Sequence, residues 1–415
     1  MAEHQSGTVE ADVSNSEGLP VNALSELLSL PDREKNDRGL AHTPAEIAQQ
    51  PETWLSTFAL FQRRQAQIAQ FLSQTGVDGS HDSRPTVLLV GAGTSDYIGQ
   101  SLTSLLRKRW RCEVLAAPST DLITHLDDIL IPDQKYLWIS FSRSGDSTEG
   151  VAALEAARKR RPDIHHLVIS CHANGRMIRE GADQPRTLTV CLEDAVNDRG
   201  LAMTSAFSNM VVFGQCLAHI NHLGEYEEVL AHLVHAGRAF LPRAADCASA
   251  LAKDAYTKAC FVGSGPLRAV ARESALKLLE LTAGKTLTTS ESALGLRHGP
   301  MAALDEHTLF VCFLSGNRNV QQYERDLLEE IGTKRLVKSR VVVAGGEISD
   351  KGAFSEHFLA PASPGAVADD YRPVLDVVFG QLLGLFFSLR WNLRPDCPSP
   401  NGSISRVVQN VRVHS

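Results

Sequence analysis

The chain has 415 residues, and at about 150 residues per domain this length allows two or three domains with a large buried core. Its composition is that of a globular protein, with 43% apolar and 21% charged residues, and its net charge of −7 argues against a nucleic-acid-binding surface. No apolar run approaches the ~20 residues of a membrane span, the amino end lacks a secretory core, and eight cysteines without a CxxC pair predict reduced thiols in a cytoplasmic protein.

Two segments precede the first predicted strand. Residues 1–40 are predicted to be an amino-terminal tail that starts polar, and residues 41–82 to be a helical segment. Within the helical segment, Thr43 and Glu46 have the spacing of a capping box, which predicts a short helix. The apolar positions of residues 54–72 recur with helical period, so a second helix is expected there.

Five short apolar runs within residues 83–225 alternate with helical sequence and predict a first domain. Strands this uniformly apolar are typical of a parallel sheet that helices cover on both faces. The five runs are Thr86–Val90, Glu113–Ala117, Tyr136–Phe141, His166–Cys171 and Thr187–Leu192. Residues 196–224 then predict a long, mostly apolar helix.

A second round of the same pattern follows a predicted helical bridge over residues 226–257. Five further apolar runs within residues 258–392 predict a second five-stranded domain; they are Ala259–Val262, Thr286–Thr289, Leu309–Leu314, Arg340–Ala344 and His357–Ala360. The stretch VGAGTS at Val90 is echoed by VGSGPL at Val262, which predicts two related α/β units in tandem. Residues 393–415 are poor in apolar positions and are predicted to be a tail over the active site.

A glycine-rich turn, Gly91-Ala92-Gly93-Thr94-Ser95, ends the first predicted strand. Glycines let a ligand approach the backbone closely, and the following helix offers free N–H groups at its positive end. The spacing differs from the dinucleotide-binding fingerprint, so no nicotinamide cofactor is expected. On spacing alone, an ordinary turn between a strand and a helix explains these residues equally well.

A serine-rich turn follows the third predicted strand. It carries Ser142, Ser144 and Ser147 around Gly145, and a helix is predicted to begin near Ser147. Hydroxyl and backbone N–H groups at such a junction suit a phosphomonoester, because they donate hydrogen bonds to its oxygens. The alternative is a plain turn in which Ser147 caps the helix. Both turns follow strands of one predicted sheet, and open α/β sheets bind ligands at that edge, so a phosphate site is the better interpretation.

Two further motifs lie in the second predicted domain. On a helix, Glu273, Lys277 and Glu280 share one face, where Glu280 could act as a general base with Lys277 as a nearby cation. Spacing alone favours a solvated stripe of salt bridges instead. His298 precedes Gly-Pro on a predicted loop, where chemistry is common, although a surface turn also explains this motif.

Six segments carry a resemblance to a known family: AHTPAEIAQQPETW (41–54), PSTDLITH (118–125), AVNDRGLAMTSAFSNM (195–210), LELTAGK (279–285), LGLRHGP (294–300) and LRPDCPSPNGSISRVVQ (393–409). Together with the turns they resemble the SIS (sugar isomerase) family, whose domains bind phosphosugars. The chain is similar to the AgaS group of galactosamine-6-phosphate deaminases/isomerases or tagatose-6-phosphate ketose/aldose isomerases, and also to the isomerase half of glucosamine-6-phosphate synthase. The resemblance covers about residues 41–412 and implies two tandem SIS domains.

The resemblance implies substrate-binding roles for the two turns. The serines of the second turn would hold the phosphate, and Ser95 of the first turn would contact the sugar. The predicted substrate-binding residues here are Thr94, Ser95, Ser142, Ser144 and Ser147.

The resemblance also implies the catalytic roles. Glu280 would move a proton between C1 and C2, Lys277 would lie near these carbons, and His298 would help to open the sugar ring from the neighbouring subunit. Arg143 would add a cation that strengthens phosphate binding. Arg406 of the tail is a substrate-binding candidate, and because an arginine stays protonated, it argues against an imine bond to the substrate.

The reaction implied by the resemblance is acid–base isomerisation of a hexose 6-phosphate, with no metal and no cofactor. The preferred substrate is galactosamine 6-phosphate, which would give tagatose 6-phosphate and ammonia; an aldose–ketose isomerase without deamination is the close alternative. An alternative of another class is a non-catalytic SIS regulator, although the first 80 residues show no basic recognition helix. We expect a homodimer or higher homo-oligomer with shared active sites and no nucleic-acid or membrane partner.

Overall fold

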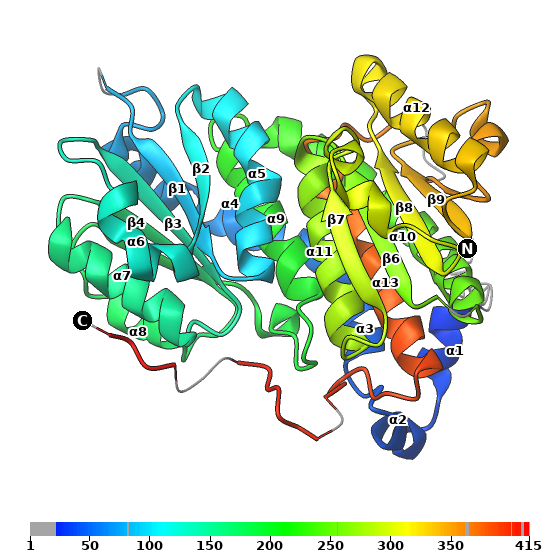
Figure 1. The fold of residues 1–415 in the computed structure, drawn as a ribbon. Coiled ribbons are helices and arrows are strands. Elements are labelled where there is room, and N and C mark those ends of the chain that lie inside the picture. The colour runs from blue at the N-terminus through cyan, green and yellow to red at the C-terminus, as the bar shows by residue number, and fades with distance from the viewer. Residues whose placement is uncertain are drawn as a thin grey trace, which may run out of the picture.

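Two five-stranded parallel sheets form the framework of the molecule and confirm the predicted α/β fold class (Figure 1). The computed structural model describes residues 22–80, 83–254, 256–361, 365–399, 401–407 and 411–414, so the polar start of the predicted amino-terminal tail lies outside the described residues. The strand order is β2-β1-β3-β4-β5 in the first sheet and β10-β9-β8-β6-β7 in the second. Read from the β7 end, with β6 as the counterpart of β1, the second order repeats the first.

The strands lie where the apolar runs predict them, within two residues at each end. In the first sheet they are β1 (Thr86–Gly91), β2 (Val114–Pro118), β3 (Tyr136–Ser142), β4 (His165–Ser170) and β5 (Thr187–Cys191). In the second they are β6 (Lys258–Gly263), β7 (Leu287–Glu291), β8 (Thr308–Leu314), β9 (Ser339–Ala344) and β10 (His357–Leu359). The apolar runs predicted these positions because most of the strands are buried on both faces.

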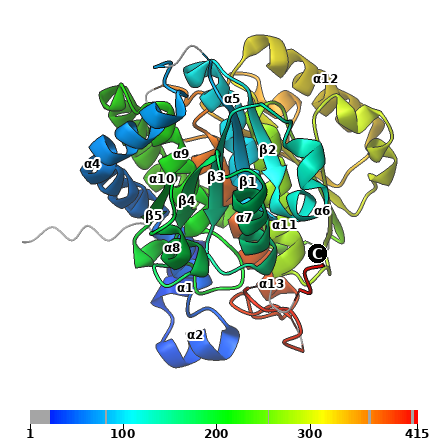
Figure 2. The ribbon, with the colours of Figure 1, turned by 90° about the vertical axis from the view of Figure 1, so that its left-hand side faces the viewer.

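Helices cover both faces of each sheet (Figures 1 and 2). The first half of the chain contributes α1 (Ala23–Ser29), α2 (Asp32–Arg38), α3 (Thr43–Ala48), α4 (Gln50–Thr75), α5 (Thr94–Trp110), α6 (Ser119–Ile129), α7 (Thr148–Arg160), α8 (Arg176–Gly181) and α9 (Ser205–Ala218). The second half contributes α10 (Leu223–Ala252), α11 (Pro266–Leu281), α12 (Arg318–Lys334) and α13 (Pro373–Arg390). Along β1, Leu88 and Val90 pack in the core beneath α6 and α7, whereas Val87 and Leu89 pack in the main core with α5 and α9.

One helix between the domains sets the position of another. By length and composition α13 is apolar enough to cross a membrane, contrary to the expectation from the sequence, but 89% of it is buried inside the protein. It packs along α11 through glycines, since a Cβ on Gly380 would lie 2.7 Å from the Cα of Ser274 and one on Gly384 would lie 2.9 Å from the Lys277 carbonyl oxygen. Helix α13 is therefore a core helix that fixes α11 against α5 of the first domain.

Two predicted features are wrong. Residues 196–224 are not one helix: a 3-10 turn (Asp194–Val196) and a loop over residues 197–204 precede α9. The reason is Asp198, whose carboxylate accepts the N–H groups of Thr204 at 2.7 Å and Ala206 at 2.9 Å and so starts α9 there. Nor do Thr43 and Glu46 form a capping box, because Thr43 lies inside α3, at its first position, and neither side chain caps that helix.

Candidate active site

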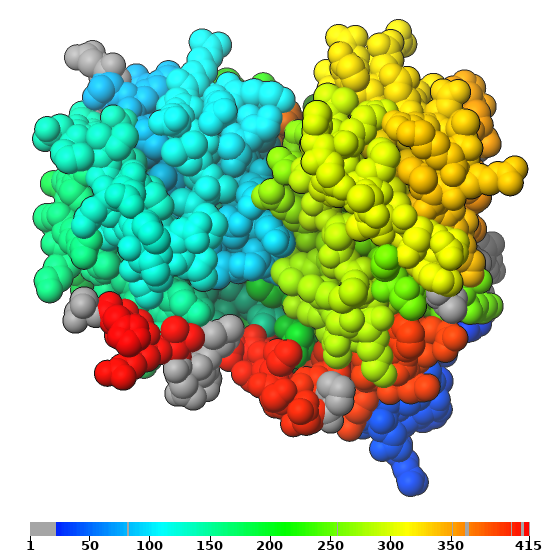
Figure 3. Space-filling view, viewed as in Figure 1, coloured from blue at the N-terminus to red at the C-terminus, as the bar shows by residue number. Residues whose placement is uncertain are grey.

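A cavity of about 260 Å³ opens at the carboxyl ends of β1 and β3 in the first domain. The glycine-rich turn, the serine-rich turn and the carboxyl-terminal tail all contribute to its walls. The predicted site residues that line it are Ser95, Ser142, Arg143, Ser144, Ser147 and Arg406. The tail reaches this cavity by running from α13 along the lower edge of both domains (Figure 3).

The serine-rich turn directs its hydroxyl groups so that they can donate. Ser142 Oγ accepts the N–H of Gly145 at 3.0 Å, and Ser144 Oγ accepts the N–H of Asp146 at 3.1 Å. Each hydroxyl hydrogen therefore remains for an acceptor in the cavity. Ser147 stands at the N-cap position of α7, as the alternative expects, but its side chain makes no capping bond. The positive end of α7 faces the same cavity, and this arrangement suits a phosphate.

The glycine-rich turn needs its glycines for steric reasons. A Cβ on Gly91 would lie 2.3 Å from the carbonyl carbon of Ser95, and Gly93 has a φ of 56°, which L-residues disfavour. The turn thereby places Ser95 in the cavity wall and Thr94 at the first position of α5. The two neighbouring residues face different parts of the site.

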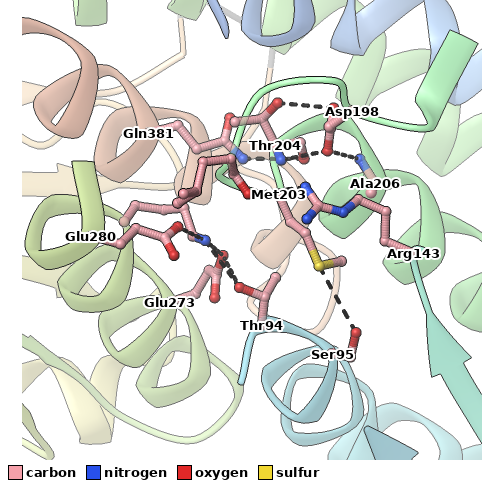
Figure 4. Close-up of polar contacts among 12 residues, drawn as sticks. Thr94, Ser95, Arg143, Asp198, Met203, Thr204, Ala206, Glu273, Glu280 and Gln381 are labelled. Carbon is pink, nitrogen blue, oxygen red and sulfur yellow. Dashed lines mark hydrogen bonds and ion pairs between the residues drawn. The ribbon is translucent and has the colours of Figure 1, made fainter. Parts of the chain in front are cut away.

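Thr94 meets an acid–base cluster on α11 of the second domain (Figure 4). Lys277 Nζ donates to Thr94 Oγ1 at 3.0 Å, lies 3.2 Å from a Glu273 carboxylate oxygen and forms an ion pair with Glu280. Thr94 Oγ1 in turn lies 3.2 Å from Glu273. Glu273 and Lys277 are fully buried, so the solvated stripe of salt bridges that spacing alone favoured is wrong. Glu280 keeps 24% of its side chain exposed and is the member that a ligand can reach.

Burial and the close charges determine the protonation of the cluster. Burial raises the pKa of Glu273 to about 8, against the opposing effect of Lys277. Burial by itself would lower the pKa of Lys277, but Glu273 and Glu280 raise it overall, so the ammonium stays charged. The cluster thus holds a permanent cation beside the partly exposed carboxylate of Glu280.

His298 lies apart from these residues. It follows the 3-10 turn Gly295–Arg297 on the loop after β7, is exposed, and does not line the cavity. The structure therefore does not bring His298 together with the serine-rich turn of its own chain.

Arg143 binds backbone carbonyls from two distant segments. Its Nη1 donates to the carbonyls of Leu201 at 3.1 Å and Gly200 at 3.3 Å, and its Nη2 donates to the carbonyl of Arg406 at 2.7 Å. Burial lowers the pKa of this guanidinium. Because the ordinary pKa of an arginine is far above neutral pH, the group stays charged. Arg143 therefore ties the serine-rich turn both to the loop over residues 197–204 and to the tail.

The same loop holds Arg406. Its Nε donates to the Asp198 carbonyl at 2.6 Å, and its Nη2 donates to Asn197 Oδ1 at 2.5 Å. Met203 of this loop lies against Ser95, with 3.9 Å between sulfur and Oγ. The sequence did not single out Asp198 or Met203, although an Asn-Asp pair before glycine is turn composition and signals the break in the predicted helix.

Glu46 of α3 supports the loop from below. Its carboxylate accepts the N–H groups of Arg199 and, at 3.3 Å, Gly200. Burial, reinforced by Asp198, raises the pKa of Glu46 from 4.5 to about 7. Near neutral pH this carboxyl group therefore changes its charge beneath the loop that carries Met203.

Replacing Glu46 with Gln is expected to flatten the pH dependence of stability between about pH 4.5 and pH 7. A raised pKa means that the folded state binds the proton more tightly, so the contribution of Glu46 is fully present below pH 4.5 and is lost as the pH rises through 7. Denaturant unfolding of both proteins at several pH values measures this slope. Parallel slopes would contradict the assignment.

Comparisons with known proteins agree with this architecture. No protein-family model matches the chain. A Streptomyces coelicolor protein named AgaS is 39% identical over 385 residues, covering 91% of this chain and 97% of that protein. The D-galactosamine-6-phosphate deaminase AgaS of Escherichia coli O157:H7 is 33% identical over 373 residues, 90% and 95% of the two chains. The crystal structure of tagatose-6-phosphate ketose/aldose isomerase from Escherichia coli matches with a TM-score of 0.80 and 29% identity, over 90% of this chain and 96% of that one. By these identities over nearly the whole of its relatives, the chain belongs to the AgaS family.

Proposed function

We propose that the protein is a phosphosugar isomerase/deaminase that holds a hexosamine 6-phosphate by its phosphate and moves a proton from C2 to C1. One observation carries the proposal: Ser95 lines the serine-rich cavity, while the preceding residue, Thr94, accepts a hydrogen bond from Lys277 of the acid–base cluster. A phosphate held in the cavity would thus place the sugar between Ser95 and Glu280. Neither domain alone would contain both parts of such a site: the binding half, which is the serine-rich turn, belongs to the first domain, and the reacting half, which is the acid–base cluster, belongs to the second.

The binding half needs no metal to hold a phosphate. The hydroxyls of Ser142, Ser144 and Ser147 would donate to its oxygens, and the positive end of α7 would favour its charge. Arg143 and Arg406 line the same cavity and would add positive potential, while their hydrogen bonds keep the tail beside it. These contacts are remote from C1 and C2 and so would fix the position of the sugar.

The reacting half would perform acid–base chemistry on the opened sugar. Glu280 would remove the C2 proton, and Lys277 would stabilise the negative charge that develops on the C1 oxygen. Glu280 would then return the proton to C1. With an amino group at C2, this leaves a ketose imine, which water converts to the ketose and ammonia.

The relatives favour galactosamine 6-phosphate as the substrate, since one is named a D-galactosamine-6-phosphate deaminase. The expected products are tagatose 6-phosphate and ammonia. The second candidate is a tagatose-6-phosphate aldose/ketose isomerase without deamination, because the crystal structure matched above carries that name.

One incubation tests these alternatives. Ammonia and ketose formed in equal amounts from galactosamine 6-phosphate support the deaminase. Conversion of galactose 6-phosphate to tagatose 6-phosphate, with no ammonia from the amino sugar, supports the isomerase. Binding of either sugar without turnover would support the non-catalytic regulator and would contradict the proposed enzyme.

The surface around His298 favours a homo-oligomer with shared sites. Strand β7 is an edge of the second sheet, Leu287 on it is 61% exposed, and Leu294 near His298 is 49% exposed. Apolar side chains on an unpaired edge suit a second copy of the chain. In such a dimer, the His298 loop would enter the partner's cavity.

Mixing two inactive variants is expected to restore activity. His298→Asn and Glu280→Gln should each be nearly inactive, but in a hybrid dimer one site would contain both intact residues. Random 1:1 re-association makes about half the dimers hybrid, so about a quarter of all sites should be active. Confirmed re-association without recovery would show that each site takes its histidine from its own chain, and a fully active monomer would exclude sharing altogether.

Ser144→Ala is expected to weaken substrate binding with little effect on turnover. The phosphate is held in ground and transition states alike, so the lost bond raises KM more than it lowers kcat. A hydrogen bond to a charged group contributes about 1.5–3 kcal/mol. Steady-state kinetics measure the effect, and an unchanged KM would contradict this location of the phosphate.

A further inference from the structure

The second domain contains a counterpart of the glycine-rich turn. A Cβ on Gly263 would lie 2.3 Å from the carbonyl oxygen of Leu267, just as one on Gly91 would lie 2.4 Å from that of Ser95. Gly265 has φ 58° and ψ −131°, close to φ 56° and ψ −123° at Gly93. The two turns therefore share one backbone geometry.

The counterpart of the serine-rich turn follows β8. By strand order β8 corresponds to β3, so residues 315–317, between β8 and α12, correspond to the turn between β3 and α7. A cavity of about 450 Å³ lies there, lined by residues of both turns. The second domain thus has a hollow in the place where the first domain has its proposed phosphate site.

A carboxylate of the chain itself occupies the donors of this second turn. Ser315 Oγ donates to Asp369 Oδ2 at 2.5 Å, and the Gly316 N–H donates to Asp369 Oδ1 at 2.9 Å. In the first domain, the hydroxyls of Ser142 and Ser144 accept backbone N–H groups and keep their hydrogens for a ligand. Asp369 therefore takes the bonds that a phosphate oxygen would take.

A buried guanidinium completes the binding of this carboxylate. Arg372 is fully buried and forms an ion pair with Asp369 Oδ1 at 3.0 Å. It also donates to the Leu314 carbonyl at 2.6 Å, which anchors it under the end of β8. A hydroxyl, a backbone N–H and an arginine around one carboxylate form a set of donors that also suits a phosphate.

We propose that the second domain retains an anion site of the phosphate type, that Asp369 fills this site as an internal anion, and that Asp369 thereby limits the protein to one phosphosugar per chain. A phosphate would meet both the occupied donors and the negative charge of Asp369. Removing the carboxylate would free the Ser315 hydroxyl and the Gly316 N–H and would take one acceptor from Arg372, which keeps its ion pair with Asp376 at 2.7 Å. The second site would then accept inorganic phosphate or a phosphomonoester.

The test counts bound phosphate. Inorganic phosphate is titrated calorimetrically into the wild type and into Asp369→Ala, and the stoichiometry is compared. The variant is expected to bind one more phosphate per chain than the wild type. This increment tests Asp369, whereas the wild-type count tests the proposed first-domain site, so failures of the two proposals are distinguishable.

Two control variants distinguish the effect of emptying the cradle, which is the set of donors from Ser315, Gly316 and Arg372, from the effect of removing a negative charge from the cavity. Asp370→Ala removes the neighbouring carboxylate, which pairs with Lys108 at 2.7 Å in the same cavity, and should add no phosphate. Asp369→Asn keeps the shape of the side chain, fills the cradle and should also add none. An extra phosphate in either control would overturn the role of Asp369.

Asp369→Ser, a second variant that empties the cradle, guards against a folding defect in the alanine variant. If either folded variant binds no additional phosphate, the proposal is wrong. If both unfold, phosphate should restore their native circular dichroism and raise their melting temperatures more than that of the wild type. Failure of that rescue would equally overturn the proposal.

Discussion

Turnover by the Glu280→Gln variant is expected to fall by ~10²–10⁴-fold while substrate binding stays largely intact. The amide keeps the shape of the side chain and can still accept a hydrogen bond from Lys277, but it cannot take a proton from C2. Glu280 is partly exposed, so the substitution leaves the buried pair of Glu273 and Lys277 in place. The expected loss is therefore one of chemistry rather than of structure.

Two measurements check this expectation. Steady-state kinetics separate kcat from KM, and NMR in deuterated water follows exchange of the C2 proton. Glu52→Gln is the matched control, because it removes a carboxylate from an exposed ion pair with Arg238 and should keep wild-type rates. Exchange at the wild-type rate in the Glu280 variant would leave Glu280 with a role in a salt bridge only.

Lys277→Met is expected to lose ~10²-fold or more in turnover. The ammonium group of Lys277 forms an ion pair with Glu280 and would stabilise the negative charge that develops on the substrate, so its removal accounts for the loss of rate.

Steady-state kinetics measure this loss. Lys277→Arg is the control: the positive charge remains, so this variant should keep more turnover than the methionine variant even if the bulkier group lowers the rate. Phosphate binding by both variants shows whether the first-domain cavity survives. Wild-type turnover in the methionine variant would mean that Lys277 does not stabilise charge during the reaction.

The sheets were predictable because most of their strands are buried on both faces. A run such as Leu309–Leu314 is apolar throughout, and no other element accounts for so short and uniform a segment between turns. Helix α2 was not predicted, since none of its residues is buried and its sequence has no apolar residues with helical spacing. The loop over residues 197–204 was missed because apolar residues surround it and its ordering comes from a buried carboxylate, Asp198.

The residues of the candidate site also differed in how well the sequence could predict them. The serine-rich turn could be predicted because its residues are consecutive and follow a clear strand. The direction of a long side chain could not be predicted. Arg143, for example, binds carbonyl groups that lie 57 and 263 residues away in sequence. The bond between Ser315 and Asp369 likewise joins residues 54 positions apart, so the echo of the glycine-rich turn at Val262 predicted the repeat but not its internal anion.

The position of Thr94 beside Ser95 has a consequence for the length of sugar that the enzyme can process. The turn proposed to bind the phosphate belongs to the first domain and Glu280 to the second, so the packing of α5 on α11 sets the spacing between them. A pentose or heptose phosphate would carry its reacting carbons one bond too near or too far. A change within the glycine-rich turn cannot correct this difference in length, because Thr94 and Ser95 are consecutive and their Cα atoms are a fixed ~3.8 Å apart. Laboratory selection for such substrates should therefore collect substitutions between α5 and α11, away from every residue that touches the sugar.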